Sequence, residues 1–176
     1  MKLLESVALL HSQHKMDRVR VLICGKGPLQ DKLESYVRAK HLGNIVHFTG
    51  FVDEDQKTRY LASADIAVFP STGGESFGIV LIEAMAAGSR VVIGGNNIGY
   101  RSVLGTKPEL LVDPNNTVAF AKQLHHFISN ERARDQAYKW QQEHVKQYDV
   151  RVVGAHLLST YETMIAKRSE SNDNSQ

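Results

Sequence analysis

The stretch from Phe69 to Gly88 constrains the fold more than any other part of the chain. It reads FPSTGGESFGIVLIEAMAAG and begins at the end of a short apolar run, Ile66–Phe69, of the kind that forms a buried parallel strand. Pro70 ends that run, and the polar and glycine residues after it favour a loop. A helix is then expected from about Ser76, apolar on nearly every side and therefore buried, with Gly88 as its terminating glycine.

The same order of strand, loop and helix recurs along the chain. Alternation of this kind predicts an α/β fold with a Rossmann-like open parallel sheet, flanking helices and further helices at the C-terminal end. Ligands bind such sheets beyond the carboxyl ends of the strands, where four loops are expected to lie on one rim. The expected strands cover residues 18–24, 45–49, 66–69, 90–93 and 110–112. The expected helices cover residues 1–14, 29–40, 53–62, 76–88, 100–104, 118–129, 131–147 and 151–167. The four loops are residues 25–28, 50–53, 70–75 and 94–100.

Two acids flank the start of the central helix. Glu75 precedes its first turn, and Glu83 lies inside an apolar segment, where an unpaired buried carboxylate would cost several kcal/mol, in order of magnitude. Because helical side chains lean toward the N-terminus, both carboxylates could approach one ligand. The amides of Phe77, Gly78 and Ile79, at the positive end of the helix dipole, suit a phosphate, and a carboxylate accepts hydrogen bonds from a diol. The pattern therefore indicates a nucleotide-sugar, although Glu75 as a helix cap and Glu83 paired with a lysine or arginine remain open.

Composition sets limits on the class of protein. The chain is 42% hydrophobic and 23% charged with a net charge of +2, which is typical of a globular protein and gives no electrostatic reason to expect nucleic acid as a partner. A single cysteine, Cys24, suits a reducing cytosol, and its apolar strand predicts a buried thiol. Without clustered histidines or cysteines we expect no metal site.

The segment Glu75-Ser-Phe-Gly-Ile-Val-Leu-Ile-Glu83 resembles the Glu-x7-Glu motif of retaining GT-B glycosyltransferases of the GT4 family. The wider string from Pro70 to Gly88 is most similar to the phosphatidylinositol mannosyltransferase branch. The likeness extends to about residue 165 and covers the C-terminal, donor-binding half of such enzymes. It implies a donor domain over residues 1–167 that lacks the family's first strand and the N-terminal acceptor domain, and we expect residues 168–176 to form a disordered tail.

The resemblance also implies roles for individual residues. Glu75 would be the catalytic contact to the hydroxyls of the donor sugar, and Glu83 would bind the ribose diol. Val52, through its backbone, and Lys57 would hold the nucleobase. The remaining donor-binding positions that it implies are Gly25, Pro70, Ser76, Phe77, Gly78, Ile79 and Val80.

The implied activity is retaining transfer of a hexose to a lipid or glycan acceptor, with mannose from GDP-mannose as the first candidate and a UDP-hexose as the other donor class. No cofactor or metal is implied, and Asp53-Glu54-Asp55 is interpreted as the start of a helix instead of a metal-binding Asp-x-Asp tag. We expect a cytoplasmic protein, placed at the inner membrane face in the whole enzyme, and a chain that alone binds donor weakly and transfers nothing. The alternatives are a catalytically silent nucleotide-sugar-binding module and another GT-B enzyme, such as a sugar-nucleotide epimerase or a sucrose-type synthase.

Overall fold

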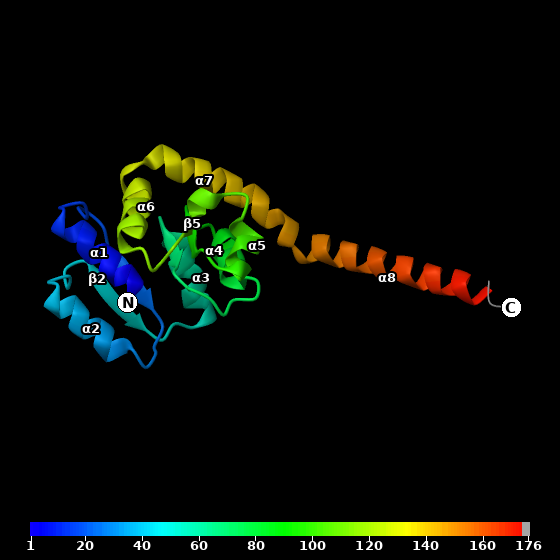
Figure 1. Ribbon diagram of the computed structural model, residues 1–176, viewed down its shortest axis with the longest axis horizontal. Coiled ribbons are helices and arrows are strands. Elements are labelled where there is room, and N and C mark those ends of the chain that lie inside the picture. Colours follow the sequence, from blue (N-terminus) through cyan, green and yellow to red (C-terminus); the bar gives the residue numbers. More distant parts are fainter. Residues whose placement is uncertain (174–176) are drawn as a thin grey trace.

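The computed structural model describes residues 1–173, and side chains as far as residue 165. Helices and strands alternate through the first two thirds, and helices follow (Figure 1). The strands are β1 (Val21–Cys24), β2 (Val46–Gly50), β3 (Ala67–Phe69), β4 (Val92–Gly95) and β5 (Leu111–Val112). The helices are α1 (Lys2–Ser12), α2 (Gln30–Ala39), α3 (Glu54–Ser63), α4 (Ile79–Ala87), α5 (Ile98–Leu104), α6 (Thr117–Ser129), α7 (Glu131–His144) and α8 (Val150–Asp173), with short 3-10 turns at Pro108–Leu110 and Val145–Tyr148.

All the strand pairs are parallel, as expected, and they form two sheets. β1 pairs with β2, with Val21 opposite Val46. The second sheet has the order β3-β4-β5, with Ala67 opposite Val92 and Gly94 opposite Leu111. The α/β class and the parallel pairing are therefore confirmed, and neither β1 nor β2 forms a ladder with the second sheet among residues 1–173.

The expectation that Cys24 is buried is also wrong. Leu22 in the same strand is 46% exposed, and Cys24 is exposed as well. β1 is an outer strand of a two-stranded sheet, so its apolar sequence is not covered in the way that a central parallel strand would be.

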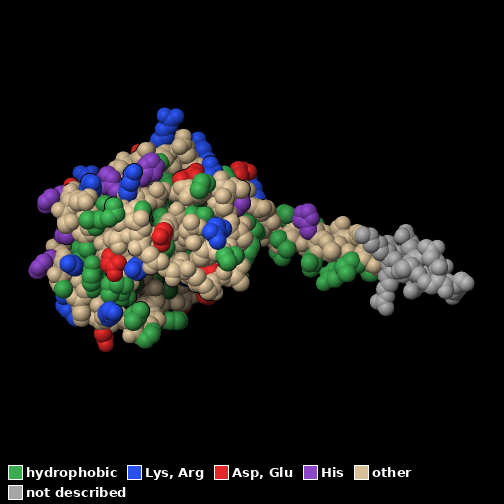
Figure 2. All heavy atoms as spheres, viewed as in Figure 1, with side chains coloured by type: hydrophobic (Ala, Val, Ile, Leu, Met, Phe, Trp, Pro, Cys, Tyr) green, Lys and Arg blue, Asp and Glu red, His purple; other side chains and the backbone are tan. Residues whose placement is uncertain are grey.

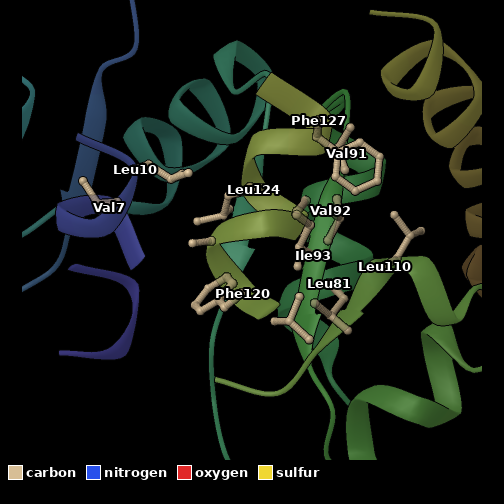
Figure 3. Close-up of a cluster of buried hydrophobic side chains, with 14 of the residues drawn as sticks. Val7, Leu10, Leu81, Val91, Val92, Ile93, Leu110, Phe120, Leu124 and Phe127 are labelled. Carbon is tan, nitrogen blue, oxygen red and sulfur yellow. The ribbon is translucent and has the colours of Figure 1, made fainter. Parts of the chain in front are cut away.

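The hydrophobic core is centred on the three-stranded sheet. Residues 91–93, leading into and along β4, are fully buried between side chains of α4 and α6, and Figure 3 labels Leu81, Phe120 and Phe127 around them. Helix α1 packs on α6, and Leu10 of α1 points toward Leu124 of α6 in the same view. One hydrophobic cluster contains residues of this helix pair and of both sheets, which makes the two sheets parts of one body.

Helix α8 leaves this body and extends away from it (Figure 1). Its backbone is helical as far as Asp173, which includes residues 168–173 of the expected tail, and residues 174–176 lie outside the described part. The segment after Gly154 contains neither glycine nor proline, so nothing in its backbone chemistry ends the helix, even though its composition is polar. Within residues 1–173, no helix has both the length and the apolar character that a membrane span requires.

Candidate functional site

The loop from Pro70 to Gly78 joins β3 to α4 at the carboxyl end of the strand. Gly78 is the N-cap of α4 and has a left-handed backbone, with φ at 105°. Glycine adopts this conformation without steric cost, and it separates the loop from the right-handed helix that starts at Ile79. The helix thus begins later than expected. Ile79 and Val80 supply its first-turn amides, while Phe77 lies in the loop, so the placement of the Phe77 and Gly78 amides in the first turn was wrong.

The C-terminal end of α4 follows the expected pattern. Gly88 has φ at 97°, and its amide donates to the Met85 carbonyl at 3.1 Å. The next amide, that of Ser89, donates to the Ala84 carbonyl at 3.0 Å. These bonds satisfy carbonyls that a helix end otherwise leaves unpaired, which confirms Gly88 as the terminating glycine.

Helix α4 is not buried on every side. Leu81, Ala84 and Met85 are fully buried, but Ile79 is 64% exposed and the Glu83 side chain is 38% exposed. Ile79 and Glu83 are four positions apart and therefore share one helix face, which is open to solvent. Glu83 consequently lies at the surface of the site and not in the core, so its carboxylate escapes most of the desolvation cost that the sequence suggested.

Glu83 forms an ion pair with Lys57 of α3. The Lys57 Nζ lies 3.3 Å from the Glu83 carboxylate and 2.7 Å from the carboxylate of Glu54. The hydrogen bond to Glu54 is the largest cause of a raised Lys57 pKa, and the bond to Glu83 adds to it. The alternative of a basic partner for Glu83 is therefore confirmed, and that partner is the residue assigned by resemblance to the nucleobase. An ammonium has three donors and a carboxylate about four acceptor positions, so the ion pair leaves capacity on both groups for a ligand.

The start of α3 is fixed by a capping box. Asp53 accepts a hydrogen bond from the Gln56 amide at 2.7 Å, and the Gln56 side chain accepts one from the Asp53 amide at 3.2 Å. The Asp53 carboxylate is thus engaged in the cap, as the interpretation of the Asp-x-Asp segment expected. Among the side chains described, those of residues 1–165, no group of three or more histidine, cysteine or acidic side chains is arranged to hold a metal ion.

Glu75 faces a different helix. Its carboxylate interacts with the hydroxyl of Tyr100 in α5, and Tyr100 is only 2% exposed. Burial raises the pKa of Tyr100 to about 12, with the Glu75 charge as the second cause. The two acids of the motif thus stand on opposite sides of the loop and helix start, Glu75 toward α5 and Glu83 toward α3. Nothing in the sequence indicated a place for Tyr100 in the site beyond its position at the end of a loop expected on the same rim.

The other predicted positions divide between the two sheets. Pro70 and Ser76 belong to the loop after β3, with Pro70 partly buried and Ser76 exposed. Val52 follows β2, and Gly25 follows β1 with φ at 109° and its amide bonded to the Gly50 carbonyl at 2.8 Å. The structure therefore brings Lys57 to Glu83, and it places Gly25 beside Gly50 on the smaller sheet.

Surface charge is mixed on one face of the molecule. On the face in Figure 2, lysine, arginine and acidic side chains are interspersed over the globular part. A separate cavity of about 400 Å³ lies near α7, and its lining includes Lys107, Phe127 and Trp140. None of the positions predicted from the sequence lines that cavity, so it does not belong to the candidate site.

Comparisons with known proteins agree with the geometry. The family model described as "Glycosyl transferases group 1" matches residues 1–144. The phosphatidyl-myo-inositol mannosyltransferase of Mycobacterium leprae is 35% identical over 154 residues, which are 88% of this chain and 40% of that protein. The corresponding protein of Mycobacterium tuberculosis is 38% identical over 151 residues, covering 83% of this chain and 39% of that protein. The chain therefore spans about 40% of the length of these relatives.

Solved structures show the same fold. Anabaena HepE in complex with UDP and glucose superposes with a TM-score of 0.75 at 22% identity, covering 92% of this chain and 44% of that one. Sucrose-phosphate synthase from Thermosynechococcus elongatus superposes with a TM-score of 0.74 at 25% identity, over 93% of this chain and 42% of that one. The resemblance based on the Glu-x7-Glu segment is thus confirmed, and the chain belongs to the group 1 family of glycosyl transferases, with a GT-B fold.

Proposed function

We propose that this chain binds the nucleotide-sugar donor of a retaining glycosyltransferase that transfers a hexose to a lipid or glycan acceptor. Mannose from GDP-mannose is the first candidate donor, because the relatives of 35–38% identity are named phosphatidyl-myo-inositol mannosyltransferases. The observation that carries the proposal is the placement of Glu75 and Glu83 on either side of the start of α4, at the carboxyl end of β3. The acceptor hydroxyl and its contacts are assigned to a separate acceptor-binding domain.

In this proposal, the start of α4 stabilises the negative charge of the leaving diphosphate. The amides of Ile79 and Val80 and the positive end of the helix dipole bind the diphosphate, whose negative charge increases as the sugar departs. Glu75 accepts hydrogen bonds from sugar hydroxyls and fixes the orientation of the ring. These groups need no cofactor or metal, and we expect the affinity for donor to be the same in EDTA.

The ion pair between Lys57 and Glu83 is compatible with donor binding. The Lys57 ammonium uses two donors on Glu54 and Glu83 and can give the third to a carbonyl oxygen of the nucleobase. The Glu83 carboxylate contacts Lys57 through Oε2 and can accept the ribose diol at its remaining positions. The pair then holds both side chains in place before the ligand arrives, which reduces the ordering cost of binding.

Removal of the Glu83 carboxylate is expected to weaken nucleotide binding. In Glu83→Gln, one charge-assisted bond to the ribose is replaced by a neutral one, and we expect about a tenfold loss of affinity for GDP-mannose or UDP-glucose. Isothermal titration of the purified chain with each donor measures the change. Glu143→Gln on α7 is the matched control, since it also removes a carboxylate from a lysine ion pair, that with Lys146, and neither residue is a predicted donor-binding position.

These titrations separate the proposal from its rivals. A scaffold with no ligand role gives no heat with any nucleotide-sugar. If the control weakens binding as much as Glu83→Gln does, a general effect of removing one negative charge from the chain explains the result and the ribose contact is excluded. A binding module without catalysis gives the same heats, and it is distinguished by a lack of transfer when the acceptor-binding domain is present.

Lys57 is expected to set the preference between nucleobases. Guanine presents O6 as an acceptor, so GDP should compete better than UDP for the wild-type chain. Lys57→Met keeps an unbranched side chain but removes the donor, and it should bring the two competition constants within about twofold of each other. Displacement of a fluorescent GDP analogue by GDP and by UDP measures the two competition constants. Equal constants in the wild type would contradict the contact of Lys57 with the nucleobase.

A further inference from the structure

We propose that helix α5 shapes the sugar-binding loop and that Tyr100 is the positioning residue for Glu75. This inference rests on the proposed function, because it assigns a partner to the side chain that contacts the donor sugar. It concerns a residue outside the Glu-x7-Glu segment, on the loop and helix that follow the neighbouring strand β4.

The ring of Tyr100 is fixed by two glycines. A Cβ atom on Gly78 would come within 2.8 Å of Tyr100 Cδ1, and a Cβ atom on Gly94 would come within 3.0 Å of Cδ2. One glycine caps α4 and the other lies in β4, so the ring fills the space between the sugar-binding loop and the sheet. Packing of this kind leaves the ring a single position, in which its hydroxyl reaches the Glu75 carboxylate.

The backbone of the loop is held by the same helix. The Asn97 side chain donates to the Ser71 carbonyl at 3.1 Å and, through its oxygen, caps α5 by accepting from the Tyr100 amide at 2.9 Å. Ser102 donates to the Phe77 carbonyl at 3.2 Å. Gly99 lies directly against the backbone of Glu75, where a side chain would overlap the Glu75 carbonyl. The loop is therefore in contact with α5 near its beginning, its middle and its end.

These contacts make Tyr100 a donor that is always available. With a pKa of about 12, its hydroxyl stays protonated at physiological pH and can donate to the Glu75 carboxylate. A carboxylate held in this way presents its remaining lone pairs in a fixed direction. Displacement of a contact group by about 1 Å can cost a factor of about 100 in activity. A Glu75 carboxylate held in one position therefore favours binding of the sugar in one orientation.

The test compares the nucleotide-sugar with the nucleotide alone. In Tyr100→Phe the ring remains and only the hydroxyl is lost, so we expect the affinity for GDP-mannose to fall by about tenfold while the affinity for GDP is unchanged. The same comparison is made with UDP-glucose and UDP. Both titrations use one preparation of each protein, so a fraction of unfolded chain changes the apparent stoichiometry and leaves the ratio of affinities intact. Tyr138→Phe on α7, an exposed tyrosine, is the control.

A second variant shows whether Tyr100 acts through Glu75. In Glu75→Gln the sugar-dependent gain in affinity should be lost, and adding Tyr100→Phe should cause no further loss. Equal losses for GDP-mannose and GDP, or additive losses in the double variant, would overturn the positioning role. A wild-type chain that binds GDP-mannose no better than GDP would overturn the inference alone, whereas a chain that binds no nucleotide-sugar would remove the proposed function and the inference with it.

Discussion

Replacing Gln141 with alanine is expected to lower the free energy of unfolding by about 3 kcal/mol. Gln141 of α7 is fully buried, and its side-chain oxygen accepts a hydrogen bond from the Val92 amide at 2.8 Å. Its amide group donates to the Ser89 and Arg90 carbonyls, each at 3.4 Å. The truncation leaves the buried Val92 amide without this partner and opens a cavity at the start of β4, so the polar and the packing costs add.

Thermal and urea unfolding followed by circular dichroism measure the effect. A chain of this length loses about 2–4 °C of Tm per kcal/mol, so Gln141→Ala should lower Tm by about 6–12 °C. Gln141→Met fills most of the volume without the hydrogen bonds, and about 2 kcal/mol of destabilisation is expected from the polar part alone. Gln136→Ala, an exposed site on the same helix, should stay within about 0.5 kcal/mol of the wild type. A Gln141→Ala variant as stable as this control would show that the buried bonds contribute nothing.

The features that could be predicted from the sequence are those that neighbouring residues determine. The capping box at Asp53 depends on Gln56, and the end of α4 depends on the left-handed conformation that Gly88 adopts. The alternation of strands and helices likewise follows from periodicity along the chain. These parts of the fold agree with the structure because the interactions responsible span only a few residues.

The features that could not be predicted depend on contacts between distant segments. Gly78 has φ at 105° in a place where Tyr100 packs against it, and this is where α4 begins. The pairing of β1 and β2 apart from the other strands is a property of the assembled sheets, and it exposes Cys24. Local sequence carries no information on either arrangement, so the helix start and the burial of Cys24 were predicted wrongly.

The candidate site shows the same division. The sequence identified Glu75 and Glu83 and gave the chemical class of a partner for Glu83, but only the packing of α3 on α4 selects Lys57. Tyr100 was missed because an aromatic residue in a short helix is usually part of the core. The one available signal was that the loop leading to Tyr100 follows a neighbouring strand, at the edge where the loop of Glu75 is also expected. The hydrogen bond from the Asn97 side chain to the Ser71 carbonyl confirms that these two loops are neighbours.

Replacing Gly99 with alanine is expected to remove the sugar-dependent part of donor binding. A Cβ atom at this position would overlap the Glu75 carbonyl oxygen, and it would lie 2.7 Å from the Glu75 carbonyl carbon and 2.9 Å from the Phe77 nitrogen. All three are backbone atoms, so the loop itself must move. A shift of about 1 Å takes the Glu75 carboxylate out of reach of the sugar and can cost a factor of about 100. GDP-mannose should then bind no more tightly than GDP.

The matched control and the stability measurement separate this effect from unfolding. Overpacking is expected to destabilise Gly99→Ala by about 1–3 kcal/mol, which circular dichroism detects, while a folded variant should still bind GDP through the start of α4. Gly154→Ala in α8 places the same methyl group where nothing lies within 4 Å, so both the affinity and the fold should be unchanged. If Gly99→Ala keeps the full preference for GDP-mannose over GDP, the loop tolerates displacement from α5, and contact with that helix cannot be what orients Glu75.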